Sequence, residues 1–120
     1  MDMPPLQTVV LRHDTPDGSF HFDWLFAVDE PPAMKLVCLR LESTPQGAEV
    51  GRRIRADRLA DHRTLYLNYE GPISGNRGSV TRVATGRYEG DVEVGRVRVT
   101  WEQHDVQEWL IRDGDVERVR

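Results

Sequence analysis

The sequence predicts an all-β protein, a compact closed or nearly closed β-barrel of about seven to nine mostly antiparallel strands with at most one short helix. Apolar and polar residues alternate with a period of two along most of the chain. The apolar stretches are short, and Gly, Pro or Asp-Gly stands at the breaks between them. No long segment shows the 3.6-residue period of an amphipathic helix. With 120 residues, the chain is expected to form a single domain, 1–120.

The first two expected strands are residues 6–14 and 20–28. In the second, FHFDWLFAV, four aromatic residues fall on one face, and His21 and Asp23 fall on the other. The stretch TPDGS between the strands contains Pro and Asp-Gly, which predict a tight turn. The two strands should therefore pair as a hairpin.

The rest of the chain continues in short strands with turn residues at the breaks. Segment 52–62 is ambiguous, because Ile54 and Leu59 fit a strand or a short helix equally well. Two segments read as loops, 43–51 and the Gly-rich 70–79. The further strands expected are 34–42, 64–69, 79–89, 91–102, 106–112 and 115–120.

Composition narrows the classes of function. The net charge of −4 argues against broad non-specific binding to nucleic acid, although arginines concentrate in residues 52–63. No apolar run reaches the roughly 18 residues of a membrane span. The single cysteine, Cys38, excludes an internal disulfide and a cysteine-based metal cluster, and its apolar neighbours predict that it is buried. We expect a cytoplasmic protein.

Two histidines and three aspartates gather in residues 13–23, HDTPDGSFHFD, in a chain that has 4 histidines. In a hairpin, the short turn could bring His13 beside His21 and Asp23. Two imidazoles and a carboxylate form an N,N,O ligand set that suits a divalent metal such as Mn²⁺ or Zn²⁺. Such a set leaves positions open for water or a phosphate oxygen, as a catalytic site requires. The alternative is that these residues are the solvent-facing half of an amphipathic strand.

A second group of polar residues lies in DHRTLYLNYEG and in the Gly-rich loop after it. His62 could be a further metal ligand or a phosphate-binding group, and Tyr66 could donate a hydrogen bond to a phosphate oxygen. The loop could offer backbone N–H groups and Arg77 to a phosphate. The alternatives are an exposed histidine, a partly buried tyrosine and a plain connecting turn.

The two blocks RHDTPDGSFHFDW and DHRTLYLNYEGPISGNRGSVTRVATGRYEG, taken in this order, resemble the 3′-phosphoesterase domain of bacterial DNA ligase D and its stand-alone relatives. The family shows His-Asp followed by His-x-Asp. It later shows Asp-His, a spaced Tyr, an aromatic-Glu-Gly, a Gly-rich loop and a strand that ends in Gly-x-Tyr-Glu. The resemblance spans roughly residues 8–101.

The resemblance implies a Mn²⁺-dependent β-barrel that processes nucleic-acid 3′ ends during DNA repair. Such domains remove a 3′-terminal ribonucleoside and then a 3′-phosphate. His13, His21 and Asp23 match the metal-binding motif, and His62 and Tyr66 match the residues that contact the scissile phosphate. The implied partners are DNA or RNA–DNA 3′ ends and repair proteins of the ligase or polymerase classes, with no membrane.

Two alternatives stay open. Where the family commonly has a phosphate-binding arginine two residues after the Asp of His-x-Asp, this chain has Leu25. Arg53, Arg55 and Arg77 are the candidates to supply that charge instead. An inactive barrel that binds a nucleic-acid end or another protein is therefore the second hypothesis. A plain interaction barrel without metal is the third, and a structure with His13 and His21 far apart would favour it.

Overall fold

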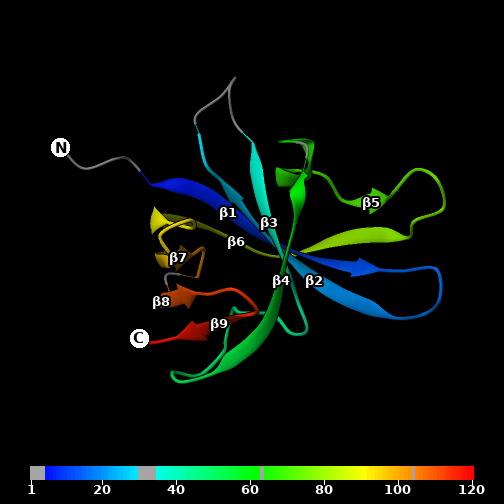
Figure 1. The fold of residues 1–120 in the computed structure, drawn as a ribbon. Coiled ribbons are helices and arrows are strands. Elements are labelled where there is room, and N and C mark those ends of the chain that lie inside the picture. Colours follow the sequence, from blue (N-terminus) through cyan, green and yellow to red (C-terminus); the bar gives the residue numbers. More distant parts are fainter. Residues whose placement is uncertain (1–4, 30–34, 63, 104) are drawn as a thin grey trace.

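The computed structural model describes residues 5–29, 35–62, 64–103 and 105–120 (Figure 1), and within these ranges all strands join one nine-stranded sheet. One 3₁₀ helix, η1, covers Thr64–Leu67. The strands are β1 Leu6–Asp14, β2 Phe20–Ala27, β3 Leu36–Leu41, β4 Arg53–His62, β5 Gly71–Pro72, β6 Ser79–Asp91, β7 Arg96–Trp101, β8 Val106–Ile111 and β9 Asp115–Arg118.

The sheet closes on itself because β1 pairs with β2 on one side and with β6 on the other. The strand order is β1-β2-β3-β4-β9-β8-β7-β6-β5, and every pairing is antiparallel. Strand β5 lies outside the closed ring and pairs only with the start of β6. The predicted all-β barrel of about seven to nine strands is confirmed as eight strands plus this outer one.

Aromatic side chains fill the barrel interior. Trp24 and Phe26 of β2 point inward, as the alternation predicts, with ring centroids 4.7 Å apart. The buried side-chain oxygen of Gln107 accepts hydrogen bonds from the indole N–H groups of Trp101 and Trp109, at 2.9 and 2.8 Å. The third buried indole, that of Trp24, donates to the Thr8 hydroxyl at 2.9 Å, so none of the three leaves an unpaired donor in the interior.

A second apolar cluster covers the outer face of β1, β2 and β3. Residues 64–78, with η1 and β5, pass over this face, and Leu67 is buried against it. Leu25 points into this layer and is 0% exposed. We call the set the outer cluster; its buried members are Val9, Leu11, Leu25, Ala27, Leu36, Cys38, Leu67 and Val80. Strands β1, β2 and β3 are thus buried on both faces where the outer cluster covers them.

The boundaries differ from prediction at several places. The segment 70–79, predicted as a loop, contains the short strand β5, because Gly71 and Pro72 pair with β6. The strand predicted at 64–69 is wrong, because Thr64–Leu67 forms a helical turn. Tyr66 and its neighbour Leu67 both pack on the outer cluster, which a turn permits and an alternating strand does not. The strand predicted at 91–102 begins only at Arg96, since β6 continues to Asp91 and a turn follows.

Segment 52–62, for which the sequence leaves strand and helix open, is a strand from Arg53. The first residue of the strand predicted at 34–42 lies outside the described residues. Cys38 is buried as predicted, and burial raises the pKa of its thiol. Among the helical segments that the structure describes, none has the length and apolar character needed to cross a membrane.

Candidate metal centre

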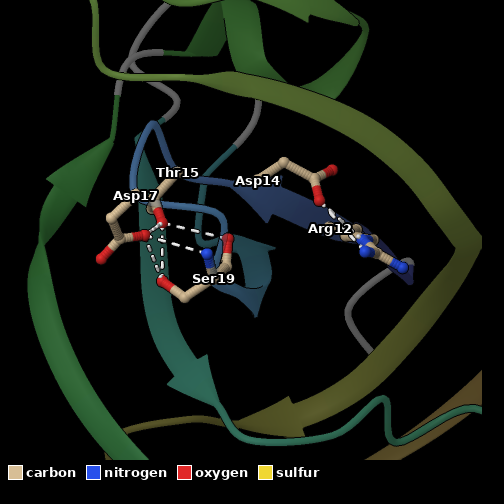
Figure 2. A network of polar contacts seen from close by, with 5 residues as sticks. All are labelled: Arg12, Asp14, Thr15, Asp17 and Ser19. Atoms are coloured by element: carbon tan, nitrogen blue, oxygen red, sulfur yellow. Dashed lines mark hydrogen bonds and ion pairs between the residues drawn. The ribbon is translucent and has the colours of Figure 1, made fainter.

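The turn between β1 and β2 fixes the register that brings the two histidines together. One carboxylate oxygen of Asp17 accepts hydrogen bonds from the Thr15 hydroxyl at 2.5 Å and from the Ser19 amide and hydroxyl at 2.9 and 2.6 Å (Figure 2). In the register that results, His13 lies directly opposite His21. The predicted hairpin is therefore confirmed.

These hydrogen bonds should be visible in the titration of Asp17. The bonds from the Ser19 and Thr15 hydroxyls, followed by the Ser19 amide, lower the pKa of Asp17 from 3.8 to about 2. Because the folded-state pKa is depressed, the stabilisation is present above pH 4 and is lost as the pH falls towards 2. Carboxyl ¹³C shifts followed against pH should give this midpoint, and Ser19→Ala should raise it. A wild-type midpoint near 4 would contradict the bonding of the turn.

The three predicted ligands lie together on the outer face of the β1–β2 hairpin. His13 Nδ1 is 3.1 Å from His21 Nε2, which is 3.3 Å from Asp23 Oδ1. His13 Nδ1 is 3.9 Å from Asp23 Oδ2. One ligand atom from each residue lies within 4.8 Å of the others, so the group could hold a metal ion. The large separation of His13 and His21 that would favour a plain barrel without metal is not found.

The tautomer of His13 is set by a backbone contact. Its Nε2 lies 2.8 Å from the carbonyl oxygen of Arg77. A carbonyl can only accept, so Nε2 carries the hydrogen, and Nδ1 presents its lone pair to His21 and Asp23 when the ring is neutral. Metal-bound histidines commonly donate their second ring N–H to a carbonyl in this way.

The burial and hydrogen bonding of the Asp23 carboxylate indicate whether a cation fits between the three side chains. Its side chain is 6% exposed, and Oδ1 accepts no hydrogen bond from any described residue. The nearby His21 Nε2 lies 3.3 Å away without the alignment of a hydrogen bond; its bond is with His13. A buried carboxylate oxygen without a partner is costly, and a bound cation would satisfy it. The donor set therefore fits a divalent ion.

The surroundings keep His21 in the neutral form that binds metals. Burial lowers its pKa; Asp23 opposes this shift, and the charges of Arg40 and His13 add to it. Arg40 is the backbone partner of Asp23 on β3 and is exposed to solvent. Among the described residues, no ion pair within 4.0 Å includes Arg40. An exposed cation is thus available beside the centre.

The second group of predicted site residues is placed only in part. The backbone of His62 pairs with Leu36, and its side chain lies outside the described part of the chain. Tyr66 is half-buried in η1 and packs edge-on against Tyr69, with ring centroids 6.0 Å apart. The hydroxyl of Tyr69 donates to the carbonyl of Pro72. These contacts assign Tyr66 a place in the outer layer beside the hairpin.

The predicted arginines lie in different surroundings. Arg53 and Arg55 are exposed on β4, which β3 separates from β2, and Arg53 Nε is 3.3 Å from Glu117. The Arg77 side chain donates to the Ser74 carbonyl at 2.7 Å, so its contribution to the centre is its own backbone carbonyl. Sequence reasoning missed this role, as well as that of the glycine that follows. Both roles depend on how the loop approaches the end of β1, which the sequence alone does not show.

No family model and no curated protein matches this chain.

Proposed function

We propose that this protein is a metal-dependent phosphoesterase that acts on nucleic-acid 3′ ends. The observation that carries the proposal is the convergence of His13, His21 and Asp23 around a buried carboxylate oxygen that accepts no hydrogen bond from the described residues. The ordered motifs shared with the 3′-phosphoesterase domain of DNA ligase D support the substrate class and favour Mn²⁺ as the metal.

In this proposal, each residue has a defined task. His13, His21 and Asp23 hold the ion, which when bound would neutralise phosphate charge and lower the pKa of a bound water. Arg40, exposed beside Asp23, binds a non-bridging phosphate oxygen with its guanidinium. His62 and Tyr66 engage the scissile phosphate, and His62 stabilises its charge or transfers a proton. Repair proteins of the ligase or polymerase classes are the proposed partners.

The test is turnover of a primer–template that ends in a 3′-ribonucleotide or a 3′-phosphate, with Mn²⁺ or Zn²⁺ supplied. We expect release of the nucleoside or of inorganic phosphate, leaving a 3′-hydroxyl, and we expect Asp23→Asn to abolish it. The exposed, distant Glu89→Gln is the matched carboxylate control and should retain activity. Metal binding without turnover of either end would refute the proposed reaction.

The burial of Leu25 favours a second candidate, an inactive barrel that binds nucleic-acid ends. The family's phosphate-binding arginine would occupy this position, and here the side chain lies in the outer cluster and is 0% exposed. Metal-dependent binding of the same 3′ ends, with both ends recovered intact, would select this candidate.

A further inference from the structure

The loop between β5 and β6 touches the candidate centre through its main chain. The Arg77 carbonyl accepts the hydrogen of His13 Nε2 at 2.8 Å, 64 residues away in sequence. This bond leaves Nδ1 of the neutral ring facing His21 and Asp23. The direction of a candidate ligand atom on β1 therefore depends on where residue 77 is held.

Gly78 determines where that carbonyl lies. Its φ is +95°, which disfavours residues with a side chain, and a Cβ there would lie 1.9 Å from the Asp14 carbonyl oxygen. The loop backbone thus rests directly on the end of β1, next to His13. Real Cβ atoms do not approach an oxygen this closely, so any larger residue must push the loop off the hairpin.

The loop is also tied to the layer beneath it. The Ile73 amide donates to the Gly78 carbonyl at 2.8 Å, which closes the loop on itself. The Ile73 side chain packs against the outer cluster. Strand β5 pairs with the start of β6 through Gly71 and Val80. These contacts hold the loop in place as one unit. A change in the position of the hairpin can therefore shift the whole loop.

We propose that Gly78 is a positioning residue of the metal centre, and that metal binding and docking of the loop at 73–78 reinforce one another. This inference rests on the proposed metal site and not on the reaction. A cation bound at Nδ1 withdraws electrons from the ring, so Nε2–H becomes a better donor to Arg77. Coupling between two binding events is reciprocal, so a docked loop raises metal affinity by the same factor.

Gly78→Ala tests the positioning role against a matched variant in the same loop. Gly75 has a φ of +75°, and a Cβ there meets only the Arg77 side chain, at 3.8 Å. Both substitutions therefore strain the backbone, and only Gly78→Ala displaces the loop from β1. By calorimetric titration with Mn²⁺, we expect affinity to fall roughly tenfold to a hundredfold in Gly78→Ala, as for loss of an outer-shell partner. Gly75→Ala should stay within about threefold of wild type.

A second measurement needs no variant and covers the case in which Gly78→Ala does not fold. Hydrogen exchange of the wild type should slow at the Ile73 amide when Mn²⁺ is added, because the loop docks more firmly. The amides of Glu93 and Val94, two exposed residues in the turn after β6, serve as an internal reference and should not change.

The outcomes separate the two proposals. A folded Gly78→Ala with wild-type Mn²⁺ affinity, or exchange at Ile73 that Mn²⁺ leaves unchanged, overturns the coupling and leaves the phosphoesterase proposal standing. Mn²⁺ binding with the expected coupling and without turnover refutes the reaction alone. A wild type that binds neither Mn²⁺ nor Zn²⁺ overturns both.

Discussion

Asp23→Asn is expected to abolish metal binding without lowering the stability of the metal-free protein. The substitution removes the only carboxylate of the ligand set, so Mn²⁺ affinity should fall by at least about a hundredfold. It also removes a buried charge whose Oδ1 accepts no hydrogen bond from the described residues. The free energy of unfolding of the metal-free form should therefore stay level or rise by about 1 kcal/mol.

Two measurements check this pair of effects. Titration calorimetry gives the Mn²⁺ affinity, and thermal unfolding with and without Mn²⁺ gives the stabilisation that the ion provides, about 2.7 kcal/mol at a hundred times Kd. Asp57→Asn is the control, since Asp57 is an exposed carboxylate on β4, which β3 separates from the strand of Asp23. A variant that binds Mn²⁺ as tightly as the wild type would show that Asp23 is not a ligand.

Leu25→Arg is expected to destabilise the protein by about 4 kcal/mol or more, because it buries a charge without a partner in an apolar layer. Leu25 is 0% exposed and packs in the outer cluster with Cys38 and Leu67. The arginine that the family pattern calls for would therefore disrupt the layer that supports the site. We expect this variant to lose activity through unfolding.

Urea denaturation measures this loss, and Leu25→Met is the matched control. Methionine preserves volume and apolar character, so its cost should stay below about 1.5 kcal/mol. A Leu25→Arg protein as stable as wild type, with phosphate turnover increased, would mean that the guanidinium escapes to the surface and completes a phosphate site.

The hairpin and its ligands are predictable from the sequence because their causes are local. TPDGS specifies the turn, and alternation in FHFDW assigns His21 and Asp23 to the same face. Together these two features are enough to bring His13 beside His21. They do not assign Arg40 to the centre, because its position beside Asp23 depends on pairing between β2 and β3. The connection between β2 and β3 is several residues long, and a connection of that length does not fix the register in which the two strands pair.

The outer layer is harder to predict, although part of the signal is present. Beyond Asp23, the polar face of β2 turns apolar at Leu25 and Ala27, and strands that are apolar on both faces are typically buried on both. The sequence does not show what covers them, since six residues of alternating character at 64–69 suit a strand as well as a helical turn. The need for Gly78 arises from its positive φ and from the approach of its backbone to Asp14, and the sequence shows neither.

The confinement of all three candidate ligands to residues 13–23 has a practical consequence. A stretch this short, containing its own turn, can be transplanted as a cassette into the hairpin of another antiparallel barrel. The acceptor would also have to supply a lid that presents a carbonyl to the first histidine and keeps water from the aspartate. A graft of the hairpin alone would carry the ligands and lack the enclosure that makes them a site.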